Sequence, residues 1–123
     1  MKIESVLCTT ITNIDLRKAE DIKAYLEKLE IPKNIFSKEY REARELELEL
    51  IRYVQILELL EKYKEDIECQ QIEMYYFRDS VETVIIANID FKKKKSRKKE
   101  FEKELKEIKS KNKRKLKKWK KDN

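Results

Sequence analysis

Residues 37–67 read SKEYREARELELELIRYVQILELLEKYKEDI, and this stretch predicts the central element of the fold. Apolar side chains recur along it at a spacing of three or four, as on one face of a helix. The stripe consists of Tyr40, Ala43, Leu46, Leu50, Val54, Leu57, Leu60 and Tyr63, and it is widened by Leu48, Ile51, Ile56 and Leu59. A helix that is apolar over so wide an arc contacts neighbours on two sides. We therefore expect a buried helix at about 38–67, opened by Ser37.

Upstream of this helix, the pattern predicts a shorter helix at about 16–30 and a strand before it. Asp15 is a suitable N-cap, because its carboxylate can accept hydrogen bonds from the unpaired N–H groups of a first turn. Pro32 ends the helix, since the residue before a proline is pushed out of helical geometry. The segment IESVLCTTIT at residues 3–12 is rich in β-branched residues and is typical of a strand.

Downstream, two β-rich runs at about 70–91 predict an antiparallel hairpin. The runs are QIEMYYF at 71–77 and TVIIANIDF at 83–91, and the short polar segment RDSVE separates them. Because no glycine is present to supply a positive φ, we expect a loop of four or five residues built on a type I turn around Arg78 to Ser80. The predicted fold class is α+β, with a small antiparallel sheet formed by the N-terminal strand and the hairpin, packed with the two helices and followed by a long basic C-terminal helix.

Charge divides the chain, which we expect to form a single domain, into an acidic body at 1–91 and a basic helical extension at 92–123. The extension contains 18 Lys and Arg against 5 Asp and Glu, whereas the body contains 13 against 20. Within the extension, Phe101, Leu105 and Ile108 follow one another at helical spacing and predict a seam that docks on the body. Leu116 and Trp119 resume the seam beyond Asn112, where the helix could project as an arm.

The density of lysine in the extension indicates contact with an anionic partner, and nucleic acid is the first choice. Lysine neutralises phosphates without regard to base sequence, and it lacks the planar fork by which arginine reads guanine. We therefore expect RNA or DNA binding of low sequence specificity, without catalysis, metal or cofactor, by the protein alone or within a nucleoprotein complex. Trp119 could stack on an unpaired base. The predicted contact residues are Lys92, Lys93, Lys94, Lys95, Arg97, Lys98, Lys99, Lys109, Lys111, Lys113, Arg114, Lys115, Lys117, Lys118, Trp119, Lys120 and Lys121.

A second interpretation is a small viral or mobile-element inhibitor that binds a nucleic-acid-processing complex of its host. In that case the acidic body would be the working surface, because carboxylates can imitate phosphates for a basic target. The candidate residues on the long helix are Glu45, Glu47, Glu49 and Glu58.

A third interpretation is enzymatic and depends on Asp79, Asp90 and Lys92. The spacing resembles the D…(D/E)xK constellation of the restriction-endonuclease-like nucleases over about fourteen residues. The resemblance implies that the two carboxylates bind Mg²⁺ and that the lysine steadies the attacking water, so the three side chains must converge at one edge of the hairpin. The absence of His and of a Gly-rich phosphate loop argues against the other common catalytic arrangements.

The remaining expectations concern compartment and packing. Cys8 and Cys69 lie 61 positions apart without a metal-binding spacing, which predicts two buried thiols in a reducing compartment. No apolar run is long enough for a membrane span, and we expect a cytoplasmic protein. The aromatic run Tyr75, Tyr76 and Phe77 could serve as an RNA platform, but core packing or a homodimer contact is favoured.

Overall fold

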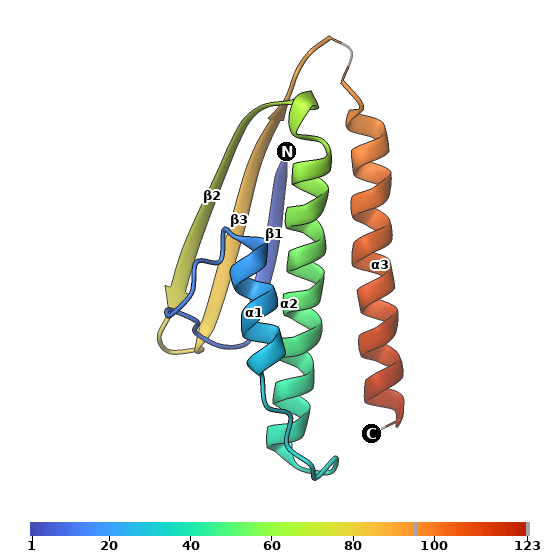
Figure 1. The fold of residues 1–123 in the computed structure, drawn as a ribbon. Helices are drawn as coiled ribbons and strands as arrows, with labels where there is room; N and C mark the ends of the chain where they lie inside the picture. Colours follow the sequence, from blue (N-terminus) through green and yellow to red (C-terminus); the bar gives the residue numbers. More distant parts are fainter. Residues whose placement is uncertain (95, 123) are drawn as a thin grey trace.

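The computed structural model describes the backbone of residues 1–94 and 96–122, and the side chains of residues 1–94 and 96–110. It confirms the predicted α+β class (Figure 1). In chain order the elements are β1 (Lys2–Leu7), α1 (Ala19–Lys28), α2 (Lys38–Lys62), a short 3-10 turn η1 (Lys64–Asp66), β2 (Ile67–Phe77), β3 (Glu82–Phe91) and α3 (Lys98–Asp122).

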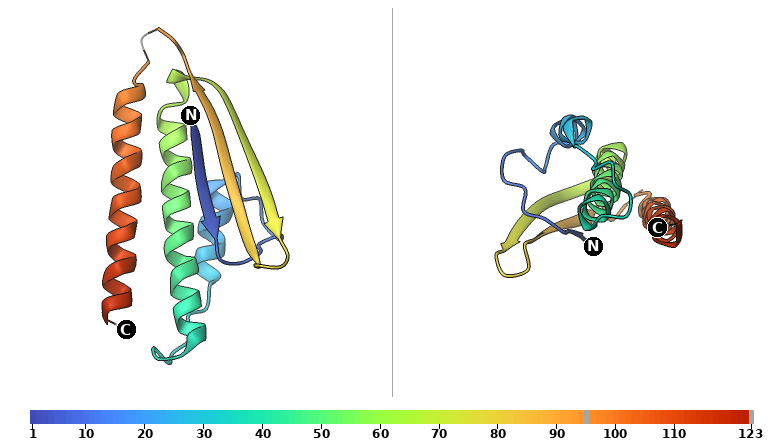
Figure 2. Two further views of the ribbon diagram at one scale, coloured as in Figure 1. Left: turned by 180° about the vertical axis from the view of Figure 1, so that it is seen from behind. Right: turned by 90° about the horizontal axis from the view of Figure 1, so that it is seen from below.

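The three strands form one antiparallel sheet in the order β1-β3-β2. In this register Ile3 and Ile72 both lie opposite Ala87, so one face of the sheet collects the apolar side chains, as the alternation predicts. The helices lie on that face. Seen from behind, the strands carry no helix of the described chain on their other side (Figure 2). The sheet is therefore covered on one side only.

The long helix α2 is the central element, as its wide apolar arc predicts, and α1 and α3 both pack against it (Figure 1). Nine of its residues are buried. The hydroxyl of Ser37 accepts a hydrogen bond from the backbone N–H of Tyr40 at 3.1 Å, which confirms the predicted cap. The helix ends at Lys62, five residues before the expected position, because Ile67 already pairs with Phe91 in the sheet.

The prediction that Asp15 caps the first helix is wrong. Its carboxylate instead accepts from the N–H of Arg17 at 2.9 Å, in a turn that precedes the helix. Lys18, in an extended conformation, is the N-cap residue, and the helix begins only at Ala19. The reason lies in Leu16, which is fully buried and whose carbonyl accepts a 2.6 Å hydrogen bond from the hydroxyl of Tyr53 on α2. This anchor holds the backbone out of helical geometry.

The hairpin loop has four residues, 78–81, which agrees with the expected length. The residue that follows the predicted turn at Arg78 to Ser80 is unusual, because Val81 takes a φ of 53°. A β-branched side chain in the left-handed region is strained, at a cost of about 1 to 3 kcal/mol. The chain has no glycine to take this position, so the hairpin forms with Val81 strained.

Candidate nucleic-acid interface

The first half of α3 belongs to the fold. Phe101 is fully buried, Leu105 is almost fully buried and Ile108 packs beside them. The ring of Phe101 meets Tyr63 edge-on at 5.6 Å and Phe91 at 5.0 Å between centroids. The predicted seam is therefore confirmed over these three residues, and its partners are α2 and the end of β3.

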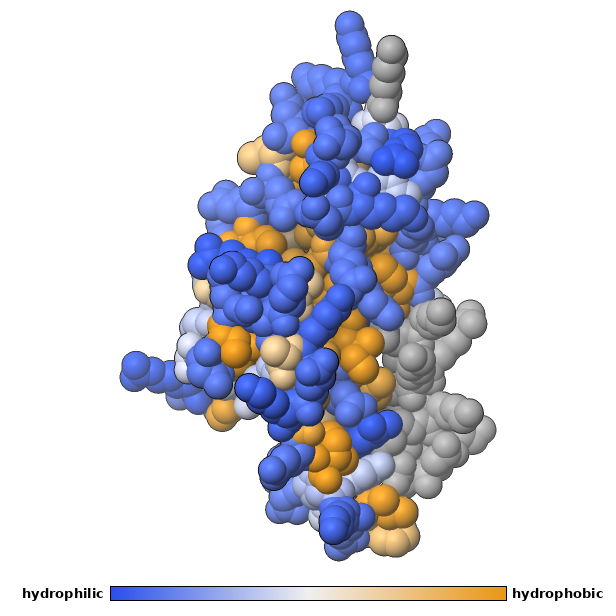
Figure 3. Space-filling model, viewed as in Figure 1, coloured by the Kyte–Doolittle hydropathy of each residue, from blue (hydrophilic) through white to orange (hydrophobic). Residues whose placement is uncertain are grey.

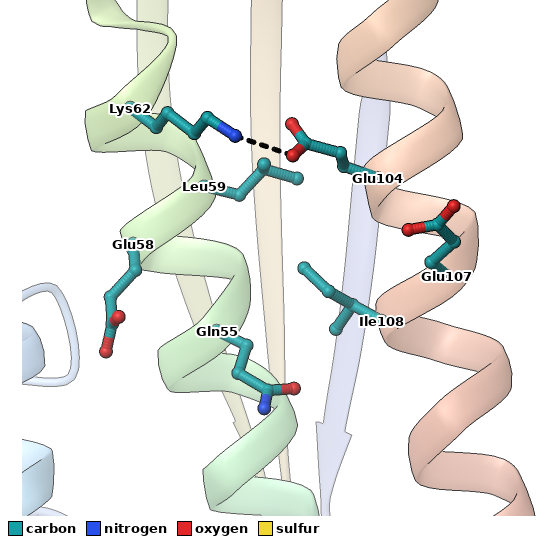
Figure 4. Close-up of a pocket in the computed structure, with 7 residues that line it drawn as sticks. All are labelled: Gln55, Glu58, Leu59, Lys62, Glu104, Glu107 and Ile108. Carbon is teal, nitrogen blue, oxygen red and sulfur yellow. Dashed lines mark hydrogen bonds and ion pairs between the residues drawn. The ribbon is translucent and has the colours of Figure 1, made fainter.

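A polar contact fixes the same two helices above a shallow groove. Lys62 on α2 and Glu104 on α3 form an ion pair at 2.6 Å, which closes one end of the groove in Figure 4. A hydrogen bond to Glu104 is the main reason why the pKa of Tyr63 rises to about 12. The groove has a volume of about 420 Å³, and Leu59 and Ile108 point into it from opposite sides (Figure 4). The groove lies between α2 and α3, and both apolar and charged residues form its walls.

With its apolar face on α2, α3 turns its lysines toward solvent. The lysines among its described side chains are all exposed, and they are Lys98, Lys99, Lys103, Lys106 and Lys109. They continue the row begun by Lys92, Lys93 and Lys94, which are also exposed and follow directly after β3. This end of the molecule is predominantly hydrophilic in Figure 3. Eight lysines therefore form a basic surface along one end and one edge of the protein, and on α3 the exposed Glu100, Glu102 and Glu107 are interleaved with them.

Arg97 is the exception among the predicted contact residues. Its guanidinium donates to Asp66 through Nε at 3.1 Å and through Nη2 at 2.9 Å, and it lies 4.7 Å from the centre of the Tyr63 ring. These hydrogen bonds hold the pKa of the Asp66 carboxyl below its usual range. The Arg97 side chain thus serves the fold. Sequence reasoning missed Asp66, because 31 positions separate it from Arg97.

The structure also brings together basic residues from the two sides of the connection between β3 and α3. Lys92, Lys93 and Lys98 line one hollow of about 440 Å³, together with Ser96. Acidic side chains reach the same hollow from the sheet, namely Glu68 and Asp90. The linear sequence reveals the concentration of lysines here, but not the hollow that three of them line or the two carboxylates beside them.

The other predicted contacts lie outside the described residues or side chains. Lys95 falls in the gap of the backbone description. The side chains beyond position 110 are likewise not described, and these are Lys111, Lys113, Arg114, Lys115, Lys117, Lys118, Trp119, Lys120 and Lys121.

The nuclease constellation is not assembled. Asp79 lies in the hairpin loop, whereas Asp90 and Lys92 lie at the opposite end of β3. Eight residues of extended chain separate Glu82 from Asp90, a span of about 26 Å. The side chains required to share one metal ion are therefore far apart.

The glutamates proposed to imitate phosphates do not form one surface. Glu47 pairs with Arg44 on its own helix, and Glu58 pairs with Lys23 on α1 at 3.0 Å. Glu45 and Glu49 instead lie beside Cys8, with ligand atoms within 4.8 Å of one another. Phosphate mimicry by these four residues as a group has no geometric support.

Both thiols are free, but the prediction that they are buried is wrong. Cys8 follows the last residue of β1, and Cys69 lies on the uncovered face of β2. The backbone N–H of Cys8 donates to Glu49 at 2.8 Å. Partial burial first, and then the charge of Glu49, raise the pKa of Cys8 to about 12. The thiol is therefore protonated over the neutral range.

For the aromatic run of β2, the first of the two favoured alternatives, core packing, is wrong, and the homodimer contact stays a prediction. Tyr75 and Tyr76 are each 45% exposed and Phe77 is 50% exposed. Tyr75 and Phe77 point to the uncovered face of the sheet, in register with Val84 and Glu82. The hydroxyl of Tyr75 is engaged by Glu73 on the same strand. Carboxylates beside the rings make this face a poor match for phosphates.

Among the described residues, no helix has both the length and the apolar character required to cross a membrane. Comparison with protein-family models, with curated proteins and with solved structures finds no match to this chain.

Proposed function

We propose that the protein binds nucleic acid, without catalysis and with low sequence specificity, through the basic surface at the β3–α3 end of the molecule. The observation that carries the proposal is the orientation of α3. Its apolar seam, with Phe101 and Leu105, is occupied by α2, and its described lysines face solvent in continuation of Lys92 to Lys94. A packed helix fixes the spacing of the positions from which its exposed cations project, and a row of cations favours a polyanion over a single small anion.

The chemistry of the surface favours the phosphate backbone over base edges. Its eight exposed cations are all lysines, interleaved on α3 with the exposed Glu100, Glu102 and Glu107, and the nearby Arg97 is engaged by Asp66. Lysine binds phosphate as a point charge, whereas bidentate recognition of guanine calls for a free arginine fork. Affinity should therefore depend steeply on salt and weakly on sequence.

The test compares two triple variants with the same change in charge. One is Lys92→Gln/Lys93→Gln/Lys98→Gln, and the control is Lys28→Gln/Lys33→Gln/Lys38→Gln on the far end of the body. Binding of labelled single-stranded and duplex oligonucleotides is followed by fluorescence anisotropy at several salt concentrations.

We expect the wild type to bind with a negative slope of log K against log salt. The first variant should flatten that slope by about 0.7 to 0.9 for each phosphate that it no longer neutralises, and the control should leave the slope almost unchanged. Absence of binding by the wild type, or equal weakening by both variants, would overturn the proposal.

A further inference from the structure

We infer that Asp66 positions the described residues of the basic loop, 92–94 and 96–97, so that Lys92, Lys93 and Lys98 act together as a preorganised phosphate-binding site. The inference rests on the proposed function and adds to it the location of the principal phosphate contact. It also implies that an acidic residue beside the basic loop strengthens the binding of an anion.

Asp66 holds both ends of the basic loop. At the first end, its main-chain carbonyl accepts from the N–H of Lys92 at 2.9 Å. At the other end, its carboxylate accepts from the N–H of Arg97 at 3.0 Å and from the Arg97 guanidinium at 2.9 and 3.1 Å. Asp66 thereby holds both Lys92 and Arg97, and it is itself only 7% exposed. A buried carboxylate with three charge-assisted or backbone donors is a rigid anchor.

The anchor is supported by the core beneath it. The N–H of Asp66 donates to the carbonyl of Tyr63 at 2.9 Å, and the Arg97 guanidinium lies over the Tyr63 ring. That ring packs edge-on against Phe101 of α3. The position of the basic loop is therefore coupled to the docking of α3, and a change at Asp66 reaches the lysines through Arg97.

The division between arginine and lysine in this segment follows the same logic. Among the seven basic residues of 92–99, Arg97 is the one arginine. A planar guanidinium fork suits a carboxylate that must be held in one geometry, whereas lysine suits a mobile phosphate. Arg97 therefore holds the loop to Asp66, and the exposed lysines remain available to bind the ligand.

Closing the loop gathers Lys92, Lys93 and Lys98 around the hollow of about 440 Å³ between the sheet and the start of α3. Holding like charges together is unfavourable in the free protein, and an anion in the hollow relieves that repulsion. Because Asp66 already fixes the backbone at Lys92 and at Arg97, less conformational entropy is lost there on binding. The phosphodiester groups of a nucleic-acid strand fit this chemistry.

The hollow also provides matched controls. Asp66→Asn, Asp90→Asn and Glu68→Gln each remove one negative charge near the same lysines. If charge alone governed binding, all three variants would bind a labelled oligonucleotide more tightly than the wild type. We expect Asp90→Asn and Glu68→Gln to do so, and Asp66→Asn to bind more weakly by about threefold to tenfold, on the scale of ordering one or two side chains again.

Arg97→Lys is the second variant and keeps the net charge constant. It should also weaken binding, because an ammonium cannot reproduce the fixed geometry in which Nε and Nη2 of Arg97 both donate to Oδ2 of Asp66. Thermal melts identify any variant that fails to fold. If Asp66→Asn fails to fold, the binding of Arg97→Lys decides the test in its place. Tighter binding by folded Asp66→Asn, or unchanged binding by folded Arg97→Lys, would overturn the inference while leaving the proposed function intact. A wild type that binds no nucleic acid would overturn both.

Discussion

Replacing Phe101 by alanine should remove the main contact that joins α3 to the rest of the protein. The side chain is fully buried, and its ring contacts Tyr63 and Phe91 from two different elements. Truncating a buried phenylalanine costs about 3 to 5 kcal/mol, which includes the transfer of the ring and the cavity left behind. The whole free energy of unfolding of a domain is about 5 to 15 kcal/mol. Phe101→Ala should therefore remove a large part of the stability.

Urea unfolding followed by circular dichroism measures the effect. With an m-value of about 2 kcal/mol/M, a destabilisation of about 4 kcal/mol lowers the midpoint by about 2 M. Glu102→Ala is the control, because its side chain is exposed next to Phe101, and it should change the stability by less than about 0.5 kcal/mol. A destabilisation below about 1 kcal/mol for Phe101→Ala would refute the docking of α3 on α2.

Two further predictions concern the body. Val81→Gly should stabilise the protein by about 1 kcal/mol, because glycine takes a positive φ without strain, whereas Ser80→Gly in the same loop should not; unfolding in urea compares them. In a Cys69→Ser background, Cys8 should react slowly with iodoacetamide at about pH 8, since its pKa is about 12, and Glu49→Gln should speed the reaction by removing a charge that raises this pKa. Between about pH 9 and pH 12 the folded state keeps the proton of Cys8, whereas the unfolded chain releases it. The contribution of the thiol to stability is therefore complete below about pH 9 and declines as the pH rises toward 12. Unchanged alkylation after Glu49→Gln would contradict this account.

The sequence predicted correctly those helices and strands whose apolar residues recur periodically. The wide stripe of α2, the seam of α3 and the alternation of the hairpin each repeat a signal over several turns or residue pairs, and the structure confirms the elements they predict. Single-residue signals were less reliable. Asp15 has the chemistry of an N-cap, but burial of Leu16 and its contact with Tyr53 decide the local backbone. Tertiary packing outweighed a local preference there.

The candidate site shows the same limit in another form. Charge counting located the lysines of the basic loop, but it treated Arg97 as one more cation. Its carboxylate partner, Asp66, lies at the end of a helical pattern, and nothing in its neighbourhood indicates a contact 31 positions away. An ion pair between distant residues leaves no periodic trace, so the residue that organises the loop could be found only in the folded chain.

The strand order has a consequence for synthesis on the ribosome. The partners of β1 lie in β3, and the amino group of Met1 donates to the carbonyl of Ile89, 88 positions later. Since β1 and β2 meet only through β3, a nascent chain that stops before Glu82 has two strands and no sheet. Closing a loop of this length costs about 4 kcal/mol of chain entropy before any pairing repays it. The emerging α1 and α2 must shelter their apolar faces on each other until the last strand arrives, which makes the body slow to complete and the lysine-rich end the last part to join it.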